Sequence, residues 1–255
     1  MKVVILAGGF GSRLSEYTHS IPKPMVPIGD KPILFHIMNY YSSFGHNEFI
    51  IALGYKANII KDYFLNYKSL NSDLTIDMKD GSVSLHGNNS LDWKVTLIDT
   101  GKNSMTGGRL LKLKKYLDKD DFMLTYGDGL SNIDINKLIK FHKKQDKIVT
   151  VSAVRPVARF GELIIENENV IDFQEKPQIE DGWINGGFFV MKPVFLNFIN
   201  DESTILEREP LERAALSRQL AAYKHNDFWQ CMDTKRDKDR LEEMYLQKSV
   251  PWIKK

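Results

Sequence analysis

Val3-Val4-Ile5-Leu6-Ala7-Gly8-Gly9-Phe10-Gly11 joins a continuous apolar run directly to a glycine-rich turn. The run from Val3 to Ala7 has no polar position, which is typical of a strand buried on both faces of a parallel sheet. Glycines that follow such a strand let backbone N–H groups approach an anion closely. The run is also far too short for the apolar core of a signal peptide or for a membrane span. This stretch therefore predicts an α/β fold of the nucleotide-binding kind.

The segments after this turn continue with alternating helices and strands. Apolar side chains recur at helical spacing over residues 32–41, and again over residues 59–64. Residues 49–53, which lie between these two helices, form a second apolar strand. Residues 69–94 are polar and contain an Asp80-Gly81 turn, which predicts a β-hairpin on the surface. The order strand, helix, strand, helix predicts a parallel sheet.

The remaining chain repeats these elements without a clear linker, and its length suits a single domain. Periodicity predicts further strands at 95–98, 122–126 and 148–154 and helices at 107–117, 135–142, 206–220 and 234–243. Short strands separated by turns follow residue 155. We therefore expect one α/β domain over residues 1–255.

The charge balance argues against a polyanionic partner. The 35 basic and 33 acidic side chains leave a net charge of +2, which creates no field to hold nucleic acid or an anionic membrane. The single cysteine, Cys231, cannot form an internal disulfide, which agrees with a reducing compartment, so we expect a cytoplasmic protein. The six histidines show no metal-ligand spacing, and we expect no covalent intermediate because no nucleophile and base form a recognisable constellation.

Two segments suit the binding of phosphate. The loop Gly8 to Arg13 combines backbone donors with the planar guanidinium of Arg13. It is not a P-loop, because it has no Gly-Lys-Ser/Thr, and it is not a dinucleotide-binding fingerprint, because Leu14 replaces the third glycine. Lys23 lies between Pro22 and Pro24, which stiffen the backbone and would hold the ammonium at a fixed reach. Either segment by itself could equally be an ordinary turn or a solvated loop.

Together, Leu6 to Leu14 and Pro22-Lys23-Pro24 resemble the signature of the sugar-1-phosphate nucleotidyltransferases. The resemblance implies a Rossmann-like, mostly parallel mixed sheet flanked by helices, with a small β excursion and a sugar-binding insert. It also implies that residues 1–130 mainly bind the nucleotide and that Arg13 and Lys23 act as catalytic cations on a nucleoside triphosphate. The nucleotide-binding residues implied in this way are Leu6, Ala7, Gly8, Gly9, Gly11, Ser12, Arg13, Lys23, Ser104, Thr106, Gly108, Arg109 and Gly127.

Two aspartates stand at positions that suit a metal ion. Asp128 directly follows the strand at 122–126, at the edge where open α/β sheets bind ligands, although Asp-Gly is also common turn chemistry. Asp233 precedes a helix and could be its N-cap or a second carboxylate for Mg²⁺. The family resemblance implies that both hold Mg²⁺. A glycosyltransferase of similar topology, the weaker enzyme hypothesis, usually carries a close Asp-x-Asp pair instead.

The second half of the chain carries the segments expected to bind the sugar. Phe173 to Pro177 and Ile184 to Phe189 would each pass for a turn or a buried strand, but in this order they resemble two segments of the family. The resemblance implies that Lys176 is a catalytic cation on the sugar phosphate. It further implies that residues 131–255 mainly bind sugar phosphate and form oligomer contacts, with the sugar bound by Gly161, Glu175, Lys176, Asn185 and Gly186.

The segment from Asp99 to Leu110 bears on the base. By itself it predicts a capped helix whose first turn, with Arg109, favours anions or base edges. It is similar to the segment that marks the family's glucose-1-phosphate cytidylyltransferase branch, which implies CTP and glucose 1-phosphate as substrates and a homo-oligomer such as a hexamer. Departures include Ser12, where threonine is common, and Cys231, where proline is usual. Another nucleoside triphosphate, another sugar 1-phosphate, or an inactive nucleotide or sugar sensor remain alternatives.

Overall fold

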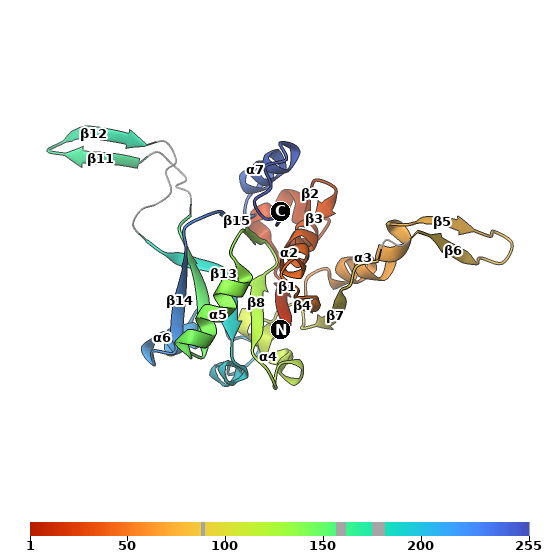
Figure 1. Cartoon of the computed structure of the whole chain (residues 1–255), viewed down its shortest axis with the longest axis horizontal. Coiled ribbons are helices and arrows are strands. Elements are labelled where there is room, and N and C mark those ends of the chain that lie inside the picture. Colours follow the sequence, from red (N-terminus) through yellow and green to blue (C-terminus); the bar gives the residue numbers. More distant parts are fainter. Residues whose placement is uncertain (88–89, 157–161, 175–181, 255) are drawn as a thin grey trace.

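A seven-stranded sheet lies at the centre of the molecule, in the order β14-β10-β13-β8-β1-β4-β7 (Figure 1). The computed structural model describes residues 1–87, 90–156, 162–174 and 182–254. Strand β13 runs antiparallel to β8 and β10, whereas β1 pairs in parallel with β4 and β8, β4 with β7, and β10 with β14. The mostly parallel mixed sheet predicted from the sequence is confirmed. The strands are β1 (Val3–Ala7), β4 (Glu48–Leu53), β7 (Lys94–Asp99), β8 (Phe122–Tyr126), β10 (Val149–Val154), β13 (Ile184–Met191) and β14 (Leu220–His225).

Both faces of the central strand β1 are buried, as its uninterrupted apolar run predicts. Val3 and Ile5 pack into one hydrophobic cluster and Val4 and Leu6 into another, because successive side chains of a strand point to opposite faces. Burial of each such side chain stabilises the fold by about 1.5–3 kcal/mol. Helices α2 (Ile33–Ser42), α3 (Ala57–Leu70), α5 (Ile135–Gln145) and α7 (Lys235–Leu246) contribute to the first cluster, and α4 (Thr106–Lys112), η4 (Pro193–Phe198) and α6 (Glu209–Leu216) to the second.

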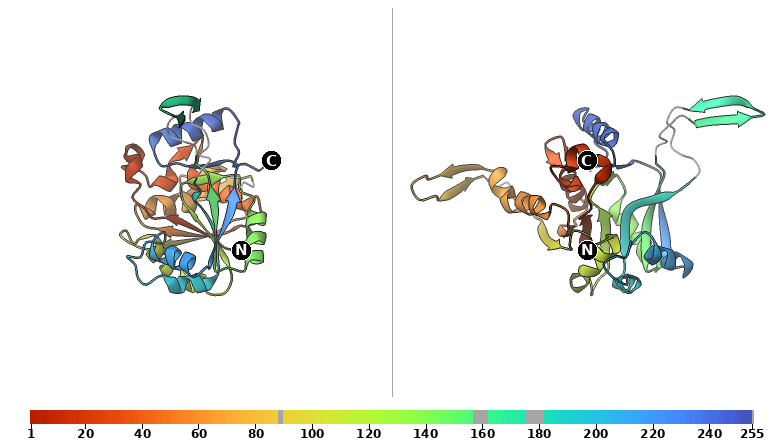
Figure 2. Two further views of the ribbon diagram at one scale, coloured as in Figure 1. Left: turned by 90° about the vertical axis from the view of Figure 1, so that its left-hand side faces the viewer. Right: turned by 180° about the vertical axis from the view of Figure 1, so that it is seen from behind.

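Several short helices and strands lie outside the central sheet. The predicted surface hairpin is confirmed as β5 (Asp73–Ile76) and β6 (Val83–His86), and it extends from the end of α3 away from the sheet, which Figure 2 shows from behind. Among the described residues, no helix is long and apolar enough to cross a bilayer. The other short elements are η1 (Ser12–Leu14), α1 (Ser15–Thr18), η2 (Lys23–Met25), β2 (Pro27–Ile28), β3 (Lys31–Pro32), η3 (Lys114–Tyr116), β9 (Gly129–Ser131), β11 (Glu162–Glu166), β12 (Asn169–Gln174) and β15 (Trp229–Cys231).

Two of the predicted helices are shorter than their periodicity suggests. The helix expected at 206–220 begins at Glu209, with Pro210 in its first turn, and ends at Leu216 because Arg218 adopts a left-handed conformation with φ 56°. Leu220 instead starts the edge strand β14, which the sequence reasoning missed. The helix expected at 107–117 ends at Lys112 and gives way to the 3₁₀ turn η3. In both places the α-helix ends before the apolar pattern does.

Candidate active site

A cavity of about 670 Å³ opens where β1 and β8 end. This is the carboxyl edge of the parallel strands, at which α/β sheets bind their ligands. The glycine-rich loop, Lys23, the start of α4 and the turn after β8 surround it. The residues at its wall that the sequence predicted are Leu6, Ala7, Gly8, Gly9, Gly11, Ser12, Arg13, Lys23, Ser104, Thr106, Arg109, Gly127, Asp128 and Asp233.

The glycine-rich loop can take its path only with glycine at its turn. Gly11 has φ 65°, a left-handed conformation that favours glycine. A Cβ atom at Gly11 would lie 2.8 Å from Cγ2 of Thr18 and 3.1 Å from Cβ of Lys23. The hydroxyl of Thr18 also donates a hydrogen bond of 3.0 Å to the Gly11 carbonyl. The loop therefore packs directly on the lysine segment, which brings the two predicted phosphate-binding segments together.

Arg109 is a buried cation that holds the wall of the cavity. Its side chain is 4% exposed, and burial lowers the pKa of its guanidinium, with Asp99 opposing that shift. Nη2 donates to the carbonyl of Gly8 at 2.9 Å, and Nη1 donates to the carbonyl of Gly101 at 2.6 Å and to the hydroxyl of Thr100 at 2.8 Å. The guanidinium thus ties the glycine-rich loop to the segment before α4. Two weaker acceptors are the carbonyls of Leu53 and Lys102.

The start of α4 is supported from behind by residues that precede α6. Thr106, the first residue of α4, donates from its hydroxyl to Glu207 at 2.7 Å. Gly108 does not line the cavity: its N–H donates to the carbonyl of Thr204 at 3.2 Å, and a Cβ atom there would overlap the carbonyl of Glu202 at 2.1 Å. Gly108, which was predicted to bind the nucleotide, therefore packs against the segment before α6 and does not line the cavity.

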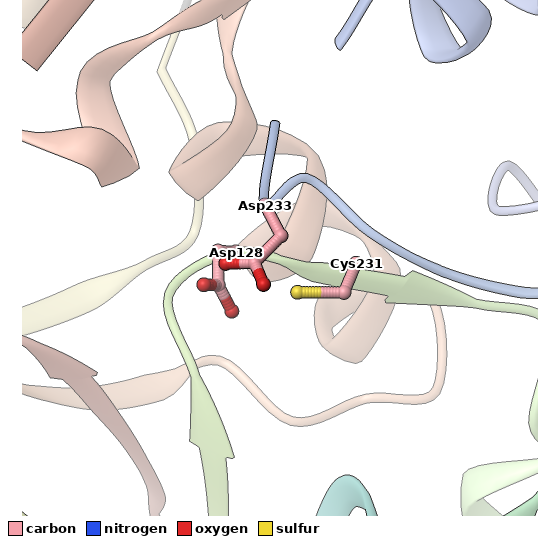
Figure 3. A group of neighbouring side chains, drawn as sticks. All are labelled: Asp128, Cys231 and Asp233. Atoms are coloured by element: carbon pink, nitrogen blue, oxygen red, sulfur yellow. The ribbon is translucent and has the colours of Figure 1, made fainter. Parts of the chain in front are cut away.

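Asp128 and Asp233 are brought together by a short antiparallel pairing. Strand β9, which follows Asp128, pairs with β15, which precedes Asp233, so that Cys231 lies opposite Gly129. The N–H of Met232 then donates to the carbonyl of Asp128 at 2.9 Å. Figure 3 shows the side chains of Asp128, Cys231 and Asp233 directed toward one another. The pairing therefore places two carboxylates from distant parts of the sequence at one edge of the cavity.

Asp233 is not the N-cap of α7. The cap is Thr234, whose hydroxyl accepts from the N–H of Asp237 in a reciprocal capping box. The side chain of Asp237 in turn accepts from the N–H groups of Asp233 and Thr234, at 3.1 and 2.8 Å. Because the helix is capped by its neighbours, the carboxylate of Asp233 is left for the cavity.

Lys23 lies between the two aspartates. Its Nζ is 2.6 Å from Oδ2 of Asp128 and 2.8 Å from Oδ1 of Asp233. Burial, the largest single influence, would lower the pKa of Lys23, but the negative groups around it, Asp128 first, together outweigh burial and raise the pKa above its ordinary value, so the side chain stays charged. The guanidinium of Arg13 contacts the remaining oxygen of Asp233 from the solvent side. The four charges form one compact ion cluster.

The same aspartates fit a divalent metal ion. Among the residues that the structure describes, one ligand atom each of Asp128, Cys231 and Asp233 lies within 4.8 Å of the other two. The oxygens of carboxylates are the ligands that Mg²⁺ prefers, and here they already hold one cation, the ammonium of Lys23. Burial, followed by the Asp128 charge, raises the pKa of the Cys231 thiol well above its usual range, so that the thiol is neutral and a weak partner for a hard ion.

Tyr126 connects this cavity to Asn185, which the sequence predicted on the sugar side. The Tyr126 hydroxyl donates to Glu207 at 2.5 Å and accepts from Nδ2 of Asn185 at 3.2 Å. Oδ1 of Asn185 accepts from the N–H of Gly187 at 2.8 Å. Gly186 is buried, and its carbonyl accepts from the indole of Trp229 at 2.7 Å. Of the remaining predicted sugar-binding residues, Gly161, Glu175 and Lys176 lie outside the described residues.

Tyr126 and Glu207 were not among the residues predicted from the sequence. The sequence could have indicated Tyr126, since it is the last residue of a strand and directly precedes Gly127-Asp128. It could not have indicated Glu207, because this residue lies in a charged segment that reads as the start of a helix. The carboxylate of Glu207 accepts from both Tyr126 and Thr106, so it joins the end of β8 to the start of α4.

A family model described as nucleotidyl transferase matches residues 2–236. The chain belongs to this family. The glucose-1-phosphate cytidylyltransferase of Salmonella typhi is 48% identical over 99% of this chain and 98% of its own length. The probable glucose-1-phosphate cytidylyltransferase of Bacillus subtilis is 43% identical over 99% of each chain. The crystal structure of HddC from Yersinia pseudotuberculosis complexed with GMP-PN is similar to this nucleotidyl transferase with a TM-score of 0.68 and 26% identity, and the match covers 96% of this chain and 99% of that one. The family predicted from the glycine-rich loop and Lys23 is confirmed.

Proposed function

We propose that the chain transfers the cytidylyl group of CTP to glucose 1-phosphate and releases pyrophosphate. The observation that carries this proposal is the 48% identity to a curated glucose-1-phosphate cytidylyltransferase over nearly the whole of both chains. The cavity supports it, because it combines backbone donors, two side-chain cations and two carboxylates at one sheet edge. Incubation of the purified chain with CTP and glucose 1-phosphate should release pyrophosphate and form CDP-glucose, and the absence of both products would contradict the proposal.

The reaction requires that the negative charges of the two substrates are compensated and that their reacting atoms are aligned. It forms no covalent intermediate with the protein. A phosphate oxygen of the sugar 1-phosphate attacks the α-phosphorus, a new P–O bond forms, and the bond from the α-phosphorus to the bridging oxygen breaks as pyrophosphate leaves. The attacking oxygen is already anionic, so the step needs no general base. We propose that Arg13 and Lys23 offset the charge of the triphosphate and that Lys176 offsets that of the sugar phosphate. The buried wall held by Arg109 fixes the loop on which the triphosphate would rest.

We further propose that Asp128 and Asp233 hold Mg²⁺. Their oxygens converge on one position that already accommodates a cation, which supports this assignment. A bound divalent ion would supply Lewis-acid polarisation of phosphate oxygens and neutralisation of charge. Gly161, Glu175, Asn185 and Gly186 stay predictions for the sugar, as do the division at residue 130, the homo-oligomer and the cytoplasmic location. An inactive sensor is disfavoured, because Arg13, Lys23, Asp128 and Asp233 all meet at the cavity.

The choice of base is the finer part of the proposal. UTP and dTTP present a carbonyl and an N–H where CTP presents an amino group and a ring nitrogen, so a pocket built for CTP would face like partners. Each unsatisfied group costs about 1–3 kcal/mol. CTP should therefore exceed UTP and dTTP by at least roughly tenfold in kcat/KM, since 1.4 kcal/mol is about one decade. A panel of nucleoside triphosphates measures this, and equal use of UTP would remove the cytidylyl assignment while leaving nucleotidyl transfer in place.

We expect Tyr126 and Glu207 to affect the binding of glucose 1-phosphate. Because the Glu207 carboxylate only accepts, Tyr126 must donate to it, and Asn185 must then direct its amide nitrogen to Tyr126. Tyr126→Phe removes this chain of donors and acceptors at a cost of about 0.5–1.5 kcal/mol. The KM for glucose 1-phosphate should rise about three- to tenfold, with a smaller change in the KM for CTP. Steady-state kinetics measures both constants. Tyr223→Phe, which alters a tyrosine remote from the cavity, is the matched control, and equal KM changes in the two variants would contradict this role.

A further inference from the structure

The ammonium of Lys23 stands between the two carboxylates that would hold Mg²⁺. It lies 2.6 Å from Asp128 and 2.8 Å from Asp233, and its side chain is 11% exposed. A Mg²⁺ ion contacts carboxylate oxygens at about 2.0–2.1 Å, so it cannot share the space between these oxygens with an ammonium group. Occupation by Lys23 and occupation by a divalent ion between Oδ2 of Asp128 and Oδ1 of Asp233 therefore exclude each other.

Charge reinforces this exclusion. The two carboxylates carry two negative charges, which the positive charges of Lys23 and Arg13 neutralise through direct contacts. The cluster is formally neutral, so it has little net attraction for a divalent ion. If both cations left, two partly buried carboxylates with side-chain exposures of 23% and 16% would face each other without compensation. A divalent ion would then be bound strongly.

The backbone of Lys23 is fixed, so a change in the position of its ammonium has to come from the side chain alone. Pro22 and Pro24 flank it, and the N–H of Met25 donates to the Pro22 carbonyl at 2.8 Å. The lysine stem lies beneath the glycine-rich loop, as the 3.1 Å approach of its Cβ to a Cβ built at Gly11 shows. Arg13 is 71% exposed on the same side of the cavity. Both cations can therefore turn from the aspartates toward an anion that rests on this loop.

We propose that Lys23 occupies the metal position in the nucleotide-free chain, and that a triphosphate draws Lys23 and Arg13 from Asp128 and Asp233 and so creates the divalent cation site. This inference rests on the proposed placement of the triphosphate at the glycine-rich loop. The nucleotide-free chain then binds a divalent ion weakly, and triphosphate and ion strengthen each other's binding by the same factor. Lys23 acts in turn as a counter-ion of the carboxylates and as a counter-ion of the phosphates.

The first test uses Mn²⁺ alone, without nucleotide, and measures the free ion by electron paramagnetic resonance. Lys23→Gln should bind Mn²⁺ at least about tenfold more tightly than the unmodified chain, within the range usual for coupled sites. Lys23→Arg keeps a cation between the aspartates and should bind Mn²⁺ as weakly as the unmodified chain. Lys102→Gln removes a positive charge from the same cavity wall, where the ammonium lies over the Phe10 ring, and should not tighten binding. Tight binding by the unmodified chain, or equal tightening in Lys102→Gln, would overturn the proposal.

The second test needs no variant and covers the case in which Lys23→Gln fails to fold. Mn²⁺ is titrated into CTP alone and into the chain saturated with CTP. The ion should dissociate at least about tenfold less readily from the ternary complex than from free CTP, because only the complex offers the released carboxylates. Equal dissociation constants would contradict the proposal. Neither test uses turnover, so a chain that binds Mn²⁺ in this way but makes no CDP-glucose would contradict the proposed function alone.

Discussion

Asp128→Asn and Asp233→Asn should each lower kcat for CDP-glucose formation by about a thousandfold. A bound divalent ion contributes several kcal/mol to the stabilisation of a phosphoryl-transfer transition state, and each 1.4 kcal/mol is a factor of ten in rate. Each substitution keeps the shape of the side chain but removes one of the two charges that converge on the cation position. Pyrophosphate release at saturating substrates, measured over a range of Mg²⁺ concentrations, gives kcat and the apparent metal affinity.

The fold should survive both substitutions. Neither carboxylate caps a helix, because Thr234 and Asp237 cap α7, and the remaining aspartate still pairs with Lys23. Asp134→Asn is a matched control, since this aspartate caps α5 and does not line the cavity, and asparagine is an equally good cap. The control should keep its kcat. A near-normal rate at low Mg²⁺ in Asp128→Asn or Asp233→Asn would remove that residue from the metal ligands.

Arg109→Met should reduce kcat/KM for CTP by at least about a hundredfold and also destabilise the fold. The substitution removes the guanidinium from three carbonyls. Gly8 keeps the N–H of Tyr55 and Leu53 keeps the N–H and hydroxyl of Thr100 as donors, whereas the carbonyl of Gly101 loses the donor that the structure shows for it, at about 1–3 kcal/mol for an acceptor left without a partner. The free energy of unfolding in urea measures the loss of stability. Calorimetric titration with CTP, corrected for the folded fraction, measures the loss of affinity, because the loop that carries Gly8 is no longer tied to the segment before α4.

Arg109→Lys separates charge from geometry. A lysine keeps the positive charge but cannot reach acceptors on the glycine-rich loop and on the segment before α4 with one planar group. It should therefore lose nearly as much CTP affinity as Arg109→Met. The KM for glucose 1-phosphate should change less in both variants. If the folded protein bound CTP normally in either variant, Arg109 would be a purely structural residue.

The parts of the site that could be predicted from sequence are those with a local signal. The apolar run of β1 and the glycines up to Gly11 predict a phosphate-binding loop. The prolines on both sides of Lys23 predict that its backbone is stiff. Asp128 follows β8 directly, so the carboxyl-edge rule places it at the cavity. Each of these inferences depends on only a few neighbouring residues.

The contacts that could not be predicted join residues far apart in the chain. Lys23 is 105 residues from Asp128 and 210 residues from Asp233, and no periodicity encodes which cation lies between which carboxylates. The family resemblance indicated Asp233, but it did not indicate that Lys23 would occupy the metal position. The helix predicted through Leu220 failed for a related reason: its last residues find partners in β10, and this tertiary pairing outweighs their helical spacing.

The direction of β13 has a consequence for the evolution and engineering of this protein. Because β13 runs against its neighbours, β10 ends and β13 begins at the same edge of the sheet, with Val154 opposite Ile184. The segment between them therefore starts and ends at neighbouring positions of the sheet. We expect that this segment can change in length without altering the strand register, because closing a longer loop costs only about 0.6 kcal/mol for each doubling of its length. The residues that we propose for the sugar phosphate, Gly161, Glu175 and Lys176, lie in this segment, so we expect its exchange with Lys176 kept to change sugar selectivity and to leave the loop, Lys23 and the aspartates untouched.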